Sequence, residues 1–381
     1  MYKFKIILTT GLAMFAMFFG SGNLVFPIKL GIDSGSQYPI ASLGLVLTGV
    51  VVPFLGLISM IFYQGDRNRY FGLLGRWAPF TLSLLILSLL GPFGVVPRCI
   101  IVAYGGISLI WPEISLILFS AVFSATILLI IWHKSKLVPI IGKILGPFKI
   151  GGIIIIIIAA VSQSPHLVDT TTSENPLLTG LFQGYQTMDL LAACFFSITI
   201  MEYLRSINPS KEEVLKTSLA ASIVGASLIS IVYLGFVVLG AYYASYLIDK
   251  GPEQYLAVIA TLALGNNAAI IVAVTMFLAC LTTAATLSKL FAEFLYHDLL
   301  KERISWPLSI IVTIIISFLL SLIGFTAISQ ILGKILEYIY PALIALSISS
   351  ILKQYMNFIP VKLIFWGTIV MSVALELIIL Y

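Results

Sequence analysis

The chain has 381 residues, of which 60% are hydrophobic and 10% are charged, with a formal net charge of +5. A soluble protein carries about a quarter charged residues, so this composition, with a mean hydropathy of +1.10, excludes a water-soluble protein. The positive charge does not indicate a nucleic-acid partner, because membrane proteins concentrate lysine and arginine in their cytoplasmic loops. Long apolar runs such as residues 151–161 are unlike the short alternating strands of a membrane barrel. The sequence therefore predicts an all-α, polytopic membrane protein.

Eleven apolar runs separated by polar residues predict eleven transmembrane helices, each of about 20 residues or more. In chain order they cover residues 5–31, 38–63, 77–110, 113–132, 137–161, 177–204, 214–247, 266–296, 306–324, 328–351 and 361–380. Residues 249–265 are too polar at their start and too short to cross, and they predict a helix lying in an external loop. We expect residues 1–381 to form one transmembrane domain.

The loop charges predict that the N-terminus lies in the cytoplasm. With this orientation, nearly all lysines and arginines of the loops fall on the inner side, and only Lys29 and Lys250 fall on the outer side. Such an excess is typical of cytoplasmic loops. Eleven spans would place the C-terminus outside.

The first span is interrupted within FFGSGNLVFP (residues 18–27), where Gly20, Ser21, Gly22 and Asn23 disfavour a continuous helix. Irregular backbone at membrane depth persists only where it is buried in protein or lines a wet cavity. The half-helix that resumes near Asn23 would direct a positive N-terminal end at an anion. A kink that serves packing is the simpler interpretation for one break alone.

The sixth span is interrupted in the same way by GYQTMD (residues 184–189). Paired interruptions in corresponding positions indicate the binding site of a transporter. The offset of five spans gives the two halves opposite orientations. This predicts a five-plus-five inverted repeat over residues 5–161 and 177–351, followed by an extra helix at 361–380.

Asp189 and Arg98 are two charges deep in the predicted spans. A charge at the bilayer centre costs about 2.5–3.5 kcal/mol on insertion scales, so it is a functional candidate. Asp189 could instead be a structural partner for backbone N–H groups, or lie near the outer surface. For Arg98 a structural or gating role is favoured, because Pro92 and Pro97 release carbonyl groups that it could bind.

The eighth span contains ACLTTAATLSK (residues 279–289), which brings the hydroxyls of Thr282 and Thr283 near the carbonyl of Ala279. Oxygen ligands without a carboxylate suit a monovalent cation better than calcium or magnesium. The carbonyls that end the first half-helix, around residues 16–19, would also face a cation. The alternative is that the threonines bond back to their own helix.

Enzyme motifs such as GxSxG, HExxH and the P-loop are absent from the sequence. The three histidines fall in loops without a second ligand at metal spacing, and the three cysteines fall inside apolar segments. We therefore expect neither an enzyme nor a cofactor.

Four motifs occur in the first, third, sixth and eighth spans, in this order: FFGSGNLVFP, GPFGVVPR, GYQTMDLLA and ACLTTA. Together they resemble the branched-chain amino acid:cation symporter family of bacteria (BrnQ-type). The resemblance covers most of the chain, and it implies the leucine-transporter fold and a location in the bacterial inner membrane.

The resemblance also implies which residues hold the substrate. The amino group would be received in the sixth-span break by Thr187 and its neighbours, among them Asp189. The carboxylate would be held by the backbone at Gly20, Ser21, Gly22 and Asn23.

A sodium site between the first and eighth spans is implied as well. Its ligands would be the carbonyls of Ala16, Phe19 and Ala279 and the hydroxyls of Thr282 and Thr283. Members of the family often carry an acidic residue where this chain has Gly105. The chain also resembles a shortened member, without a twelfth span.

We therefore predict a sodium-coupled symporter that imports leucine, isoleucine, valine or similar apolar amino acids by alternating access. Proton coupling, with Asp189 as the titrating group, is the alternative within the same class. An amino-acid sensor or channel that does not accumulate solute is an alternative from another class.

Overall fold

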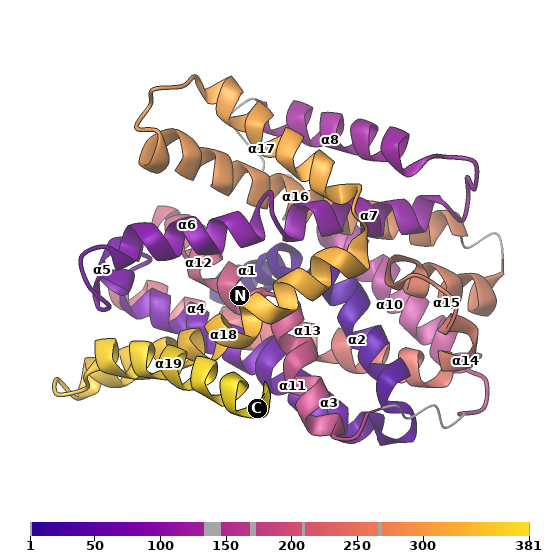
Figure 1. The fold of residues 1–381 in the computed structure, drawn as a ribbon, viewed down its shortest axis with the longest axis horizontal. Helices are drawn as coiled ribbons and strands as arrows, with labels where there is room; N and C mark the ends of the chain where they lie inside the picture. The colour runs from indigo at the N-terminus through magenta and orange to yellow at the C-terminus, as the bar shows by residue number, and fades with distance from the viewer. Residues whose placement is uncertain (1, 133–145, 168–172, 208–209, 266–268, 381) are drawn as a thin grey trace.

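The computed structural model describes residues 2–132, 146–167, 173–207, 210–265 and 269–380, and the regular elements in these ranges are all helical (Figure 1). The helices up to residue 162 are α1 (Tyr2–Phe18), α2 (Ser21–Ser34), η1 (Gly35–Gln37), α3 (Tyr38–Val46), η2 (Leu47–Val51), α4 (Val52–Phe62), α5 (Arg67–Gly72), α6 (Ala78–Leu90), α7 (Val95–Ile107), α8 (Leu116–Trp132) and α10 (Gly146–Ser162). The later helices are α11 (Pro176–Gln186), α12 (Asp189–Ile207), α13 (Lys211–Tyr242), α14 (Ala244–Leu247), η4 (Pro252–Gln254), α15 (Tyr255–Leu264), α16 (Ala269–Phe294), η6 (Leu295–Leu299), α17 (Trp306–Ser321), α18 (Phe325–Tyr355) and α19 (Val361–Leu380). The predicted all-α fold is confirmed.

Six helical stretches of the described chain are long and apolar enough to cross a membrane, at residues 21–62, 78–107, 189–207, 211–242, 269–299 and 325–355. Shorter apolar helices accompany them at residues 116–132, 147–162, 306–321 and 361–375. The first stretch turns at Gly35, whose φ of 47° lies in the left-handed region that favours glycine. Eleven membrane crossings stay a prediction.

The third predicted span consists of two helices, because residues 91–94 form turns between α6 and α7. Pro92 cannot donate a backbone hydrogen bond, and the glycines on either side of it weaken a helix further. The helix predicted within residues 249–265 is confirmed as α15.

Both predicted interruptions are confirmed. α1 ends at Phe18 and α2 begins at Ser21, two residues before the predicted restart near Asn23. α11 ends at Gln186 and α12 begins at Asp189. Each break therefore exposes the backbone groups of two helix ends, one C-terminal and one N-terminal.

The two broken helices pack reciprocally. α1 and α2 lie along α13, whereas α11 lies along α3 and α12 along α4. Each broken helix thus contacts the segment that follows the other one in the chain, as expected for two inverted repeats. α8 and α17 form a layer at the top of Figure 1, and α19 packs on α18.

Glycines let helix backbones meet at these crossings. A Cβ added at Gly31 of α2 would lie 2.1 Å from the carbonyl oxygen of Val237 in α13, and one added at Gly240 would lie 2.0 Å from that of Ile28 in α2. Gly180 of α11 meets the backbone of α3 in the same way. Small residues at helix contacts are typical of membrane bundles, where close packing replaces the hydrophobic effect between helices.

Candidate functional site

The first break presents a buried helix N-terminus. The N–H of Gly20 donates to Oδ1 of Asn23 at 2.8 Å, as a third-position side chain does in a capping box. The next N–H groups, in the first turn of α2, have no acceptor within the helix. This end carries about half a positive charge, and residues 20–23 around it are buried. The break can therefore bind an anionic group.

The second break places Asp189 at the start of α12. Met188 before it has a φ of 61°, a left-handed conformation that costs energy for an L residue. The hydroxyl of Thr187 donates to the carbonyl of Gly184 at 2.8 Å. Its oxygen lone pairs remain able to accept a hydrogen bond from a cationic group.

Asn23, Asp189 and Tyr233 join the two breaks in one buried hydrogen-bond network. Nδ2 of Asn23 donates to Oδ2 of Asp189 at 2.8 Å and to the hydroxyl of Tyr233. The hydroxyl of Tyr233 donates to the same carboxylate oxygen at 2.8 Å. Sequence reasoning missed Tyr233, for which the only signal is a tyrosine in the apolar run of α13.

The buried charged side chains of the described residues are Arg98, Lys149 and Asp189, with exposed fractions of 0%, 0% and 2%. Each lies in one of the two breaks or donates hydrogen bonds to it. A charge inside a membrane protein marks a functional site by default. The buried charges therefore converge on the interrupted backbone.

Arg98 of α7 binds the end of α11. Nη1 donates to the carbonyl of Gln186 at 3.1 Å and Nη2 to Sδ of Met188 at 2.9 Å. The guanidinium carbon lies 5.4 Å from the ring centroid of Phe26. The expectation that Arg98 binds carbonyls of its own segment is not met, because the negative C-terminal end of α11 provides its acceptor.

The predicted cation ligands meet between α1 and α16. The hydroxyl of Thr283 donates to the carbonyl of Phe19 at 3.3 Å. The hydroxyl of Thr282 donates back to the carbonyl of Ala279 at 3.0 Å. One threonine thus bonds to the first break and the other to its own helix, and the cation site stays a prediction.

Lys149, in the first turn of α10, lies at the same place. Its Nζ donates to the carbonyl of Ala16 at 3.1 Å and to the carbonyl of Phe19, and it lies 5.4 Å from the ring centroid of Phe19. Sequence reasoning missed this residue. The available signal was a lysine deep in the apolar run of residues 137–161.

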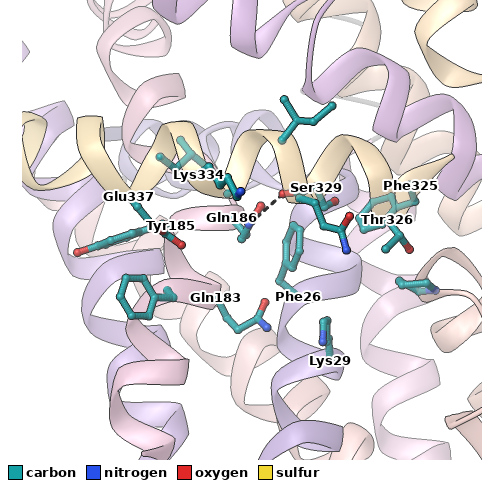
Figure 2. A pocket seen from close by; sticks show the side chains of 16 residues that line it. Phe26, Lys29, Gln183, Tyr185, Gln186, Phe325, Thr326, Ser329, Lys334 and Glu337 are labelled. Atoms are coloured by element: carbon teal, nitrogen blue, oxygen red, sulfur yellow. Dashed lines mark hydrogen bonds between the residues drawn. The ribbon is translucent and has the colours of Figure 1, made fainter. Parts of the chain in front are cut away.

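A vestibule of ≈ 830 Å³ opens beside α2 and is bounded by α11, η4 and the first turns of α18 (Figure 2). Phe26 and Lys334 are among the side chains that line it. Its floor is the end of α11, where Nε2 of Gln186 donates to the carbonyl of Ser329 at 3.2 Å. Arg98 holds the carbonyl of Gln186 from α7, so this floor is tied to α7 as well as to α18.

A second cavity, of ≈ 10 Å³, lies at the breaks themselves. Its polar lining comes from both breaks and from Thr283 of α16, and its apolar lining includes Phe18, Leu90, Val95 and Phe196. This volume corresponds to about one water molecule. Helices around the breaks must therefore move apart before an amino acid can enter.

Gly105 lies against the loop that carries η4. A Cβ added at Gly105 would lie 2.1 Å from the carbonyl oxygen of Glu253. A larger side chain is therefore excluded at this position while η4 stays in place. Burial disfavours the charged form of Glu253 and raises the pKa of its carboxyl group.

Residues 3–379 match the family described as Branched-chain amino acid transport protein. The chain belongs to this family. It is 28% identical over 371 residues to the branched-chain amino acid transport system 2 carrier protein of Pseudomonas aeruginosa, with 94% of this chain and 84% of that protein covered. It is 27% identical over 352 residues to the branched-chain amino acid permease BrnQ of Corynebacterium glutamicum, with 92% and 81% covered. The predicted family is confirmed, and the protein is a multi-pass membrane transporter and not an enzyme.

Solved transporters share the fold. The structure of MhsT in complex with L-phenylalanine matches with a TM-score of 0.61 at 15% identity, covering 97% of this chain and 98% of that one. Mhp1 in a closed conformation with bromovinylhydantoin matches with a TM-score of 0.64 at 13% identity, covering 97% and 90%. These likenesses show a leucine-transporter-like fold.

Replacing Arg98 with lysine should lower the initial rate of leucine uptake about tenfold, which corresponds to about 1.4 kcal/mol. A single ammonium cannot hold both Gln186 and Met188 as the planar guanidinium does. The measurement is uptake of labelled leucine in cells with matched amounts of protein. Arg76→Lys, at an exposed arginine, is the control. Unchanged uptake by R98K would show that transport does not need the guanidinium to hold Gln186 and Met188.

Replacing Gly20 with alanine should lower uptake about tenfold, and a second change, Thr283→Ser, should restore most of it. The φ of −126° at Gly20 allows alanine, but its Cβ would lie 2.8 Å from Cγ2 of Thr283. Serine removes this methyl group and keeps the hydroxyl that bonds to Phe19. Initial rates of uptake by the two single variants and the double variant measure whether positions 20 and 283 interact. If the effects of the two changes on the rate are strictly additive in free energy, the predicted contact between them is refuted.

Proposed function

We propose that this protein imports leucine, isoleucine, valine or similar apolar amino acids by alternating access around its two broken helices. In this proposal residues 1–381 form one domain of eleven spans, with inverted repeats at 5–161 and 177–351 and an extra helix at 361–380. The observation that carries it is the hydrogen-bond network of Asn23, Asp189 and Tyr233, which joins both breaks. The chain belongs to a branched-chain amino acid transport family, which supports this class of substrate.

The substrate carboxylate would bind the N-terminal end of α2. The backbone N–H groups there, at Ser21, Gly22 and Asn23, have no acceptor within the helix, and helix N-termini bind anions. Gly22 lets the two breaks approach closely, since a Cβ added there would lie 3.1 Å from Cα of Thr187. A carboxylate at this end would therefore lie next to the second break.

The substrate amino group would face the second break. The carboxylate of Asp189 supplies a negative charge, and the hydroxyl of Thr187 and the last carbonyls of α11 supply acceptors. A zwitterion would thus span the two breaks, with each charged end opposite a complementary helix end.

The substrate side chain would lie against apolar residues. Phe18, Leu90, Val95 and Phe196 line the cavity at the breaks, and apolar walls favour apolar side chains. Because the cavity is small, binding would accompany a rearrangement of the surrounding helices.

We infer that the N-terminus is cytoplasmic and that the vestibule faces the outside of a bacterial inner membrane. The excess of lysine and arginine on the N-terminal side supports this orientation. The vestibule borders α2, which follows the break, so it lies on the side opposite the start of α1. Substrate would enter through the floor at Gln186 and leave on the cytoplasmic side.

Sodium coupling through Ala16, Phe19, Ala279, Thr282 and Thr283 stays a prediction. One cation moving inward through 100 mV would supply about 2.3 kcal/mol. The hydrogen bonds of Lys149 to the carbonyls of Ala16 and Phe19 favour the second candidate, a proton, because an ammonium already occupies acceptors that a sodium ion would need.

Uptake of labelled leucine in membrane vesicles tests the proposed function. We expect uptake that is competed by isoleucine and valine among the twenty amino acids and that depends on a sodium or proton gradient. Absence of uptake for every apolar amino acid would refute it. Equilibration without uphill accumulation in proteoliposomes would instead indicate the sensor or channel alternative.

A further inference from the structure

Tyr340 of α18 contacts both halves of the second break. Its hydroxyl accepts a hydrogen bond from the backbone N–H of Leu190, in the first turn of α12, at 3.1 Å. Its ring stacks on that of Tyr185 in α11, with ring centroids 4.4 Å apart and an interplanar angle of 27°. The side chain of Tyr340 is fully buried. One residue on a third helix therefore connects the two pieces of the broken span.

The hydrogen bond to Leu190 supplies a helix cap that the chain does not provide locally. The first N–H groups of a helix have no acceptor within it, and a side-chain oxygen at the position before the helix usually accepts from the second or third of them. Met188 directly precedes α12 and has no side-chain oxygen, and its Sδ accepts from Nη2 of Arg98 at 2.9 Å. Leu190 carries the second N–H of α12, so the hydroxyl of Tyr340 takes the part of the cap.

The side chain of Leu190 is held as well. It packs against Gly56 of α4, where an added Cβ would lie 2.5 Å from Cδ1 of Leu190. Both α12 and α18 pack along α4. The start of α12 is therefore fixed from two sides, by a close contact with α4 and by a hydrogen bond to α18.

Asp189, the first residue of α12, directly precedes Leu190. Asn23 and the hydroxyl of Tyr233 both donate to Oδ2 of its carboxylate. These bonds hold the tip of the side chain, whereas Tyr340 holds the backbone next to it. A charged group in a binding site needs such supporting contacts to keep its productive position.

The same helix also holds the end of α11. At the vestibule floor the carbonyl of Ser329 in α18 accepts from Nε2 of Gln186. Tyr185, the stacking partner of Tyr340, lines the vestibule (Figure 2). The groups that would face the substrate amino group are the last carbonyls of α11 and the carboxylate of Asp189, so α18 supports both.

We propose that Tyr340 is a positioning residue for recognition of the substrate amino group. Its hydroxyl holds the start of α12 so that the carboxylate of Asp189 stays opposite the amino group, and its ring keeps the end of α11 beside that carboxylate. This inference rests on the proposed amino-acid import. Loss of the hydroxyl leaves the N–H of Leu190 buried without this acceptor, which is costly, so the start of α12 shifts and Asp189 moves with it.

Competition for uptake of labelled leucine into proteoliposomes that contain the full-length protein tests this role. 4-Methylpentanoate is leucine without its amino group. The ratio of its half-inhibitory concentration to that of unlabelled leucine therefore measures how strongly the amino group is recognised, and this ratio does not depend on the amount of folded protein.

Tyr340→Phe keeps the stacked ring and removes the hydroxyl. It should lower the ratio about tenfold, because leucine binds more weakly while 4-methylpentanoate stays within about twofold of its wild-type value. An unchanged ratio, including an equal weakening of both compounds, would mean that Tyr340 only supports the fold and would overturn the proposal. Absence of leucine uptake by the wild type would instead refute the import itself.

Tyr243→Phe is the matched control. Tyr243 is also a buried tyrosine, and its hydroxyl donates to the carbonyl of Ala160 at 2.9 Å, at the far end of α13 from its first turn. The same change of tyrosine to phenylalanine there should leave the ratio at its wild-type value.

A double variant shows through which group Tyr340 acts. Asp189→Asn removes the charge that Tyr340 positions, so adding Tyr340→Phe should lower the ratio by less than about twofold more. A further tenfold loss would mean that Tyr340 acts on leucine independently of Asp189, and it would overturn the proposal. If Tyr340→Phe does not fold, Tyr185→Leu, which removes the stacked ring from α11, decides in its place. A lowered ratio in that variant supports the role of Tyr340, and a wild-type ratio overturns it.

Discussion

Replacing Asp189 with asparagine is expected to lower the ratio of maximal rate to KM for leucine uptake about a hundredfold. The amide has nearly the same shape, and its oxygen can still accept hydrogen bonds from Asn23 and Tyr233. The negative charge that would face the substrate amino group is lost. A hydrogen bond to a charged group contributes about 1.5–3 kcal/mol, which corresponds to a factor of about a hundred at the upper end.

A leucine analogue without the amino group separates this role from a structural one. Wild-type protein should prefer leucine strongly over 4-methylpentanoate, and D189N should lose most of that preference. Asp249→Asn, at an exposed loop residue, should behave like the wild type. If D189N keeps leucine–leucine exchange and loses only the response to a pH gradient, Asp189 is a titrating group and the assignment to the amino group is wrong.

Replacing Gly240 with alanine is expected to prevent stable folding. The added Cβ would lie 2.0 Å from the carbonyl oxygen of Ile28 and 2.8 Å from its carbonyl carbon. These are backbone atoms, so no side-chain rotation relieves the contact, and α2 and α13 must separate. Overpacking typically costs about 1–3 kcal/mol and more where the neighbours cannot move. The measurement is the thermal unfolding temperature of the detergent-solubilised protein, with the yield of monodisperse material.

Gly367→Ala is the matched control, because a Cβ added there meets nothing within 4 Å. Alanine also favours a helix more than glycine does, so this variant should unfold at the same temperature or slightly higher. An unfolding temperature of G240A equal to that of G367A would show that the α2–α13 crossing is not packed backbone to backbone.

The class of protein and both helix breaks follow from local sequence. Apolar runs without charge are stable only in a membrane, and FFGSGNLVFP and GYQTMD each interrupt such a run with residues that weaken a helix. The same local reasoning gave only one span for residues 77–110, where the structure has α6 and α7. The glycines and the proline at residues 91–94 indicate a break between α6 and α7, but whether such residues end a helix depends on the neighbouring helices.

The partners of the buried charges depend on tertiary structure. Lys149 bonds to a carbonyl 133 positions earlier in the chain, Arg98 to one 88 positions later, and Asn23 to a side chain 166 positions later. No sequence periodicity encodes such distances. Tyr233 and Lys149 therefore escaped prediction, although each is a polar residue within an apolar run.

The sequence by itself determined that this protein is a helical membrane protein with two broken helices, because hydrophobicity and helix propensity act over neighbouring residues. The tertiary structure alone decided which groups meet there. It brought the ammonium of Lys149 to the carbonyls of Ala16 and Phe19 and the carboxylate of Asp189 to Asn23. Those meetings follow from the packing of α1, α10 and α12 in space, which fixes where each helix end points.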